Sequence, residues 1–188
     1  VRDNREDVSL YGETIFGLSM YNMEEKLSAY WKDATTFDTQ YYISRTNISS
    51  VFETNSGIGL NDMRYRSNYG FIHTSGNSFL CRKYLGSGLY GEKIPLIRLA
   101  EMYLIYAEAV LRGGVGGDKD KAVGYFNKLR ERAFGNQSAN VENITLNDIL
   151  DERSREFYWE CFRRTDLIRY GLYTSGSYVW QWKGGTKD

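Results

Sequence analysis

Three glutamates at four-residue intervals, Glu152, Glu156 and Glu160, are the residues of this sequence best spaced for acid–base chemistry. Glycoside hydrolysis uses two carboxyl groups at a defined separation, and the acid of the pair needs an apolar pocket that keeps it protonated. The sequence supplies no such pocket, and carboxylates on one helical face repel one another unless cations neutralise them. Four arginines stand in the same stretch: Arg153, Arg155, Arg163 and Arg164. The pattern therefore favours solvated or interhelical ion pairs, with a glycoside hydrolase as the weaker alternative.

Other catalytic and metal-binding patterns are missing from the sequence. Cys81 and Cys161 are far apart and outside any CxxC spacing, and His73 has no partner within helical reach. The motifs GxSxG, HExxH and the phosphate-binding loop do not occur. We expect no catalytic residue, no metal and no cofactor. The two cysteines are interpreted as buried or half-buried thiols, with a disulfide between them as the alternative.

Aromatic residues are the compositional outlier, with 16 tyrosines, nine phenylalanines and four tryptophans beside a single proline. Tyrosine and tryptophan combine a flat apolar face with a polar edge. Such a ring suits a protein core, and it equally suits a platform for a sugar ring or a peptide. Composition alone does not separate these uses.

The charge balance excludes some classes of partner. Lysine plus arginine and aspartate plus glutamate each number 24, so the basic excess that holds a phosphate backbone is missing. The longest apolar run, residues 94–112, carries Arg98, Glu101 and Glu108. Each of these charges would cost about 3 kcal/mol at the centre of a bilayer. We therefore predict no nucleic-acid partner and no transmembrane segment in this sequence.

The same run, 94–112, is the predicted central helix. Pro95 would occupy its first turn, where no backbone N–H is required and a fixed φ is favourable. Because this helix is apolar over most of its circumference, other elements are expected to pack around it. Its charged residues share one stripe at the spacing of intrahelical ion pairs, which predicts structural roles for Arg98, Glu101, Glu108 and Arg112.

Further helices are predicted along the rest of the chain. Glycines within 113–117 end the first helix, and Asp118 caps a one-sided helix over 119–134, which completes an antiparallel hairpin. Thr145 with Asp148 forms a capping box that begins a third helix. The apolar stripe of this third helix is expected to reach Cys161, and a short fourth helix is predicted over 165–170 and ends at Gly171.

The first half of the chain has a different character. Short apolar runs at 14–18, 41–43 and 50–52 alternate with Gly, Asn, Ser, Asp and Thr clusters, which predicts brief strands and loops, and residues 24–31 could form two helical turns. The predicted fold class is mainly α. It consists of a loop-rich region with short strands over 1–91, the candidate ligand-facing part, and a helical region over 92–188 whose hairpin is the unit from which helical repeat arrays are built.

Five blocks of the sequence form an ordered pattern. They are Glu13-Thr14-Ile15-Phe16; Asp62-Met63-Arg64; Ile94-Pro95 with Arg98-Leu99-Ala100-Glu101 and Tyr103-Leu104-Ile105-Tyr106-Ala107-Glu108-Ala109; Ala122 with Phe126-Asn127-Lys128-Leu129-Arg130-Glu131-Arg132-Ala133; and Asp151-Glu152-Arg153 with Glu156-Phe157, Glu160, Arg163, Asp166-Leu167, Arg169 and Gly171. In this order they resemble the signature blocks of the SusD/RagB family, the surface glycan-binding lipoproteins of Bacteroidetes-type nutrient uptake systems. The chain departs from the family pattern at Cys161, where glycine is common, and at Arg164 and Tyr170, where tryptophans are common.

The resemblance implies that the helical hairpins over 92–188 are tetratricopeptide-like, and it also implies a function and a location. It implies a non-catalytic protein that captures an oligosaccharide or polysaccharide for a SusC-like TonB-dependent outer-membrane transporter. Such a protein is exposed at the cell surface and anchored by lipid on an N-terminal cysteine that this sequence does not contain. The chain would then be the C-terminal portion of a longer protein whose N-terminal repeat half lies outside it. A helical-repeat scaffold that binds protein or peptide ligands is the alternative.

The resemblance also implies that the glycan is bound by loops and not by the helical repeats. Sugar recognition stacks a pyranose on an exposed aromatic ring beside polar side chains. The first group of candidates is Tyr21, Asn22, Tyr30, Trp31, Lys32, Asp33, Tyr41 and Tyr42; the second is Tyr65, Arg66 and Tyr69; the third is Trp180 with Trp182. Ordinary packing is the competing interpretation for each of them.

Overall fold

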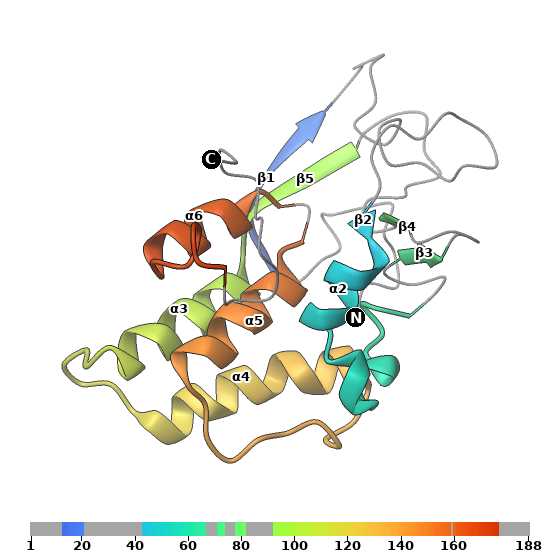
Figure 1. The fold of residues 1–188 in the computed structure, drawn as a ribbon. Coiled ribbons are helices and arrows are strands. Elements are labelled where there is room, and N and C mark those ends of the chain that lie inside the picture. Colours follow the sequence, from blue (N-terminus) through green and yellow to red (C-terminus); the bar gives the residue numbers. More distant parts are fainter. Residues whose placement is uncertain are drawn as a thin grey trace.

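In the computed structural model the chain is described at residues 13–20, 43–66, 71–73, 78–81, 92–158 and 160–176. The elements are β1 (Thr14–Met20), β2 (Ile43–Ser44), α2 (Arg45–Val51), the 3-10 turns η2 (Thr54–Ser56) and η3 (Ile58–Asn61), β3 (Phe71–His73), β4 (Ser78–Cys81), β5 (Glu92–Arg98), α3 (Leu99–Leu111), α4 (Lys119–Phe134), α5 (Leu146–Glu156) and α6 (Phe162–Arg169). Figure 1 shows α3, α4 and α5 side by side, with the β1–β5 ribbon leading away from the start of α3. The fold is mainly helical with few strands, which confirms the predicted class.

The α3–α4 hairpin forms as the sequence predicts. Helix α4 has the predicted bounds, Lys119–Phe134, and the Asp118 carboxylate accepts a hydrogen bond of 3.0 Å from the backbone N–H of Lys121. Gly113 and Gly116, with φ of 86° and 77°, supply the left-handed turn between the helices. The two helices share one apolar core with α5, formed by Ala100, Leu104, Ala107, Val110, Ala122, Phe126, Leu129 and Ile149. Among the described residues, none of the helices has the length and apolar character to cross a membrane.

The start of α3 differs from the prediction. Residues 92–98 form strand β5, which pairs antiparallel with β1, so the helix begins at Leu99 and not at Pro95. Pro95 stands opposite Gly17, next to a shift in the register of the ribbon. Proline tolerates such a position because its fixed φ suits an irregular edge strand as well as a first helical turn. The local pattern could not distinguish the two, since the deciding partner strand is distant in sequence.

Helix α3 is also less enclosed than its composition suggested. Helices α4 and α5 cover its inner face, and Leu104 and Ala107 are fully buried there. Ile105 and Leu99 nevertheless remain 47% and 37% exposed. The expectation that other elements surround α3 is therefore wrong for its outer face within this chain.

The capping box that begins α5 is confirmed, but the predicted end of α5 is wrong. Thr145 and Asp148 exchange the two bonds of the box, at 2.7 and 3.2 Å. The helix then ends at Glu156, and Cys161 lies between α5 and α6 with a left-handed φ of 64°. Cys161 is an exposed free thiol, so its predicted place on a buried stripe is wrong. Helix α6 consequently begins at Phe162, ahead of the predicted start.

Where the structure describes the first half of the chain, it shows one α-helix that the sequence did not predict. Strand β1 is confirmed, but residues 50–52 do not form the predicted strand: residues 50 and 51 end helix α2, and Phe52 lies in the turn that follows it. A small core contains Ile48, Val51, Phe52 and Tyr65. Val51 and Phe52 follow Ile48 by three and four residues, which is the spacing that places side chains on one buried side of a helix. The helical turns predicted at 24–31 lie outside the described residues.

Gly124 is an exposed glycine in the middle of α4, and a Cβ added there would meet no atom within 4 Å. Because glycine in a helix interior is about 1 kcal/mol less favourable than alanine, Gly124→Ala is expected to raise the free energy of unfolding by about that amount. Urea denaturation would measure the change. Gly117→Ala is the matched control, since its Cβ would lie 2.8 Å from Val110 Cγ2 and should destabilise the protein. A destabilised Gly124→Ala variant would contradict this interpretation.

Candidate functional site

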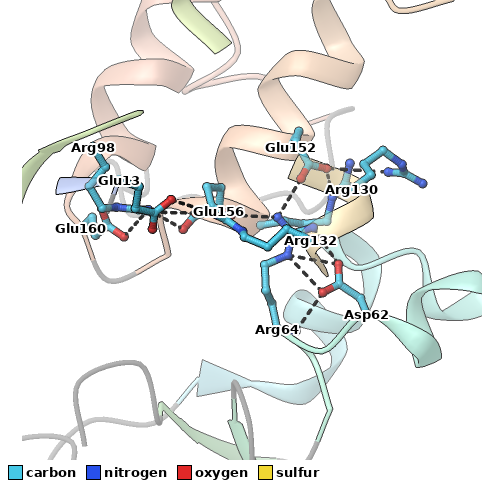
Figure 2. Close-up of polar contacts among 10 residues, drawn as sticks. Glu13, Asp62, Arg64, Arg98, Arg130, Arg132, Glu152, Glu156 and Glu160 are labelled. Atoms are coloured by element: carbon cyan, nitrogen blue, oxygen red, sulfur yellow. Dashed lines mark hydrogen bonds and ion pairs between the residues drawn. The ribbon is translucent and has the colours of Figure 1, made fainter. Parts of the chain in front are cut away.

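The charged residues of the sequence blocks meet in one network, most of it buried (Figure 2). Its labelled members come from the residue before β1, the loop after η3, the end of β5, α4, and α5 with the turn after it. They are Glu13, Asp62, Arg64, Arg98, Arg130, Arg132, Glu152, Glu156 and Glu160. In Figure 2, Glu156 lies between Arg98 on one side and Arg132 with Arg64 on the other. The network therefore connects the ribbon, the helices and the loop after η3.

Arg98 holds the end of the network that reaches the β1–β5 ribbon. Its side chain is 1% exposed, and its guanidinium donates to Glu160 at 3.1 and 2.8 Å and to Glu156 Oε1 at 2.8 Å. The same guanidinium contacts Glu13 at 3.0 Å. Arg98 was predicted to pair within its own helix. The structure instead places it at the end of β5, where its partners come from distant parts of the chain.

Arg64 holds the opposite end. Its guanidinium forms a bidentate pair with Asp62, with Nε and Nη2 donating at 3.0 and 2.7 Å, and Nη1 donates to Glu152 at 2.7 Å and to Glu156 at 3.1 Å. The backbone N–H of Met63 donates to the carbonyl of Ala133 at 2.8 Å. The Asp62-Met63-Arg64 block thus attaches its loop to both α4 and α5.

Glu152 is the most enclosed carboxylate, with a side chain that is 0% exposed. Besides Arg64, it accepts a bond of 2.9 Å from Arg155 and lies 3.7 Å from Arg130. Burial by itself raises the pKa of Glu152, but the charges of Arg64 and Arg155, the hydrogen bond from Arg64 and the charge of Arg130 outweigh it and lower the pKa to about 2. Glu152 is therefore ionised at neutral pH.

These contacts decide between the two interpretations of the three glutamates. Glu156 is shared among Arg64, Arg98 and Arg132, with Arg132 Nη2 at 2.6 Å, and Glu160 is bound by Arg98. The prediction that cations neutralise the three glutamates is confirmed, but of the four arginines in the same stretch only Arg155 binds one of them in the recorded pairs. Further partners, Arg64, Arg98 and Arg132, come from the loop after η3, the end of β5 and α4, and the pairs are largely buried. A general acid requires a raised pKa, which is the opposite of what the structure shows for Glu152. The arrangement supports a structural role.

A second group of ion pairs joins α3 to α6. Arg112 donates to Glu108 at 2.7 Å, as the i, i+4 spacing predicted, and Arg169 also contacts Glu108. Asp166 is held by Arg153 at 2.7 Å and by Arg169 at 2.9 Å. Within the described ranges, no group of three His, Cys, Asp or Glu side chains is arranged to hold a metal ion.

The predicted glycan-binding residues fall mostly outside the described part of the chain. Those outside it are Tyr21, Asn22, Tyr30, Trp31, Lys32, Asp33, Tyr41, Tyr42, Tyr69, Trp180 and Trp182. Tyr65 is described and is 5% exposed; its ring lies 5.5 Å from that of Phe52, and its hydroxyl lies 3.1 Å from Ser49 Oγ. Since a sugar stacks on an exposed ring, Tyr65 in this position belongs to the core, and the neighbouring Arg66 is exposed.

Comparisons with known proteins agree on one family. A sequence model of the SusD family matches residues 3–188. The starch-binding protein SusD of Bacteroides thetaiotaomicron is 50% identical over 95 residues, which are 50% of this chain and 16% of that protein. A SusD-like protein of Bacteroides ovatus is 34% identical over 97 residues, which are 50% of this chain and 17% of that protein. The aligned segments are thus a minor part of both relatives.

Solved structures give the same result for the fold. The crystal structure of a Bacteroides vulgatus protein assigned to sugar binding superimposes with a TM-score of 0.65 and 27% identity, over 85% of this chain and 34% of that one. A SusD superfamily protein of Bacteroides thetaiotaomicron superimposes with a TM-score of 0.64 and 20% identity, over 92% and 41% of the two chains, and it bears on the fold alone. With the family model spanning nearly all of its residues, this chain belongs to the SusD family.

Proposed function

We propose that the protein containing this chain is a non-catalytic glycan-binding protein that captures oligosaccharide for an outer-membrane uptake system. The observation that carries this proposal is the 50% identity, over half of the chain, to the starch-binding protein SusD. The structural likeness to a sugar-binding protein supports it. The arginine-bound state of Glu152 and Glu156 supports the absence of a hydrolytic step in this part of the protein.

We place the glycan contacts on the segment between β1 and β2, residues 21–42. Both ends of this segment adjoin parts of the fold that are held by buried or half-buried polar contacts. Glu13, just before β1, binds Arg98 and Arg132, and α2, just after β2, is held through the carbonyl of Val51 by Arg155 at 2.9 Å. Binding loops are commonly carried in this way on a rigid scaffold.

The proposed contact residues within this segment are aromatic and amide side chains: Tyr21, Asn22, Tyr30, Trp31, Tyr41 and Tyr42. Trp180 and Trp182 near the other end of the sequence extend the proposal. Family membership further supports a SusC-like TonB-dependent transporter as the protein partner and a lipid-anchored position at the outer-membrane surface.

Isothermal titration of the full-length protein against a polysaccharide panel, with starch included, would test glycan binding. Because a stacked aromatic ring contributes much of the contact with a sugar, Trp31→Ala is expected to weaken binding by about tenfold. Tyr173→Ala, a half-buried tyrosine outside the proposed segment, is the matched control and should bind as the wild type does.

Three outcomes would count against the proposal. Failure of every glycan to bind would refute the function, and wild-type affinity in the Trp31→Ala variant would refute the placement of the site. Release of new reducing ends from a bound glycan would refute the non-catalytic assignment and favour a hydrolase.

A further inference from the structure

The described polar contacts between the β1–β5 ribbon and the helices gather at the end of the ribbon where β5 passes into α3 (Figure 1). Side chains are described for ribbon residues 14–17 and 95–98, and none of these belongs to one of the apolar cores formed by the described residues. Ile15 and Phe16 are instead 58% and 53% exposed. Burial in those cores therefore does not fix the angle between the ribbon and the helices.

The pairing of the two strands is irregular close to this junction. The register shifts between Thr14 and Phe16 and again between Phe16 and Gly17, and Pro95, opposite Gly17, has no N–H to donate. A register shift interrupts the ladder of hydrogen bonds and lets the strand bend. Farther out, residues 18–20 pair with residues 92–94 in continuous register. The ribbon is thus regular in its outer part and interrupted next to the helices, which is where it can bend.

Glu13 ties the start of β1 to the helices in two ways. Its carboxylate binds Arg98 at 3.0 Å and also binds Arg132 of α4 (Figure 2). Its backbone carbonyl accepts a hydrogen bond of 2.7 Å from the N–H of Leu99. Leu99 is the first residue of α3, so this N–H has no acceptor within the helix. Because one residue makes both contacts, movement of Glu13 away from Arg132 also removes the acceptor of the Leu99 N–H.

The Glu13 contacts can open without leaving either arginine unpaired. Arg98 would keep Glu156 and Glu160, each at 2.8 Å, and Arg132 would keep Glu156 at 2.6 Å. The Glu13 side chain is 19% exposed, against 1% for Glu156. Water can therefore hydrate the Glu13 carboxylate once it separates from the arginines, whereas a buried carboxylate that lost its partners would stay unmatched.

We propose that the β1–β5 ribbon rotates as a unit about the junction between β5 and α3, and that Glu13 is the positioning residue that holds it against the helices through Arg132. In the open state residues 18–20 stay paired with residues 92–94, the Glu13 carboxylate is hydrated, and the N–H of Leu99 faces water. The inference concerns the described residues and does not rest on glycan binding, so each proposal can fail without the other.

The test is amide hydrogen exchange of the full-length protein, resolved to single residues by mass spectrometry with electron-transfer fragmentation. Glu13→Gln removes the charge at nearly constant volume. We expect the Leu99 amide to exchange about tenfold faster in this variant than in the wild type, because a hydrogen bond to a charged group is lost when the ribbon is held less firmly. The amides that pair residues 18–20 with 92–94, and the Leu104 amide inside α3, should exchange as in the wild type.

Two further variants complete the test. Arg132→Met should reproduce the effect of Glu13→Gln, since Glu156 keeps Arg64 and Arg98. Glu160→Gln is the matched control: it also removes one carboxylate from Arg98, but Glu160 follows α5 and lies outside the ribbon, so the exchange of Leu99 should not change.

The wild type supplies a measurement that needs no variant. Because opening of the ribbon costs less than unfolding of the helices, the Leu99 amide should exchange at least about tenfold faster than the Leu104 amide. Equal wild-type rates at these two amides would overturn the proposal, as would unchanged exchange of Leu99 in Glu13→Gln or in Arg132→Met. An equal increase at Leu104 would indicate global destabilisation, and an equal increase in the 18–20 ladder would indicate unfolding of the ribbon. Either result, or an equal effect of Glu160→Gln, would also overturn it.

Discussion

Replacing Arg98 with methionine is expected to lower the free energy of unfolding by about 3–5 kcal/mol. Arg98 is 1% exposed and neutralises Glu156, Glu160 and Glu13 at distances of 2.8 to 3.0 Å. Methionine fills a similar volume but leaves buried carboxylates with less positive charge and fewer hydrogen-bond donors. The loss of one partner from a buried pair is costly because the remaining charge can neither be hydrated nor matched.

Urea denaturation of the wild type and of R98M would measure this loss. R112M is the matched control, because Arg112 also binds a glutamate at 2.7 Å but is 44% exposed. An exposed pair contributes at most about 1 kcal/mol, so R112M should be nearly neutral. If R98M and R112M lowered the free energy of unfolding by similar amounts, burial would not explain the contribution of the Arg98 ion pairs to stability.

Acidification is expected to remove on the order of 3 kcal/mol of stability through Glu152 alone, since each pKa unit corresponds to about 1.4 kcal/mol. The pKa of this fully buried carboxyl is about 2 in the folded protein against an ordinary value of 4.5. A folded-state pKa below the unfolded one means that the unfolded chain binds the proton first. The contribution is therefore complete above pH 4.5 and is lost as the pH falls toward 2.

The free energy of unfolding, measured between neutral pH and the lowest pH at which the protein stays soluble, would test this expectation. Glu152→Gln should be destabilised at neutral pH by about 3–5 kcal/mol, because Arg64, Arg130 and Arg155 lose their shared anion. Its stability should then depend less on pH than that of the wild type. Glu142→Gln, at an exposed position, is the control and should keep the wild-type dependence. Parallel curves for Glu152→Gln and the wild type would contradict the assignment.

Both predictions follow from one structural fact: the charged residues of five separate sequence blocks contact one another. Buried ion pairs are weak sources of stability, because desolvation of both charges offsets their attraction. Their geometry is nevertheless demanding, since each unmatched charge is costly. We infer that this network acts mainly to hold the ribbon, the loop after η3 and the helices in one arrangement, and that it leaves ligand contacts to other parts of the protein.

The sequence by itself determined the features that depend on neighbouring residues. The bounds of α4, its Asp118 cap and the Thr145–Asp148 box were all predicted correctly, because helix spacing and capping act within a few residues. The ordered blocks also predicted the family, which the match over residues 3–188 confirms. The proposed glycan contacts stay predictions, since they lie outside the described residues; of the candidates named from the sequence, the structure describes Tyr65, which is buried, and Arg66, which is exposed.

Tertiary structure alone decided what depends on distant residues. Strand β1 made residues 92–98 a strand instead of the first turn of a helix, and the left-handed turn at Cys161 separated α5 from α6. The partners of Arg98 and the ionised state of Glu152 likewise depend on segments about 60 to 90 residues away along the chain. Helical spacing predicted that these charges pair. Which charges meet, and how deeply they are buried, follows only from the packing that brings the segments together, because Coulomb energy depends on distance and local dielectric and not on sequence separation.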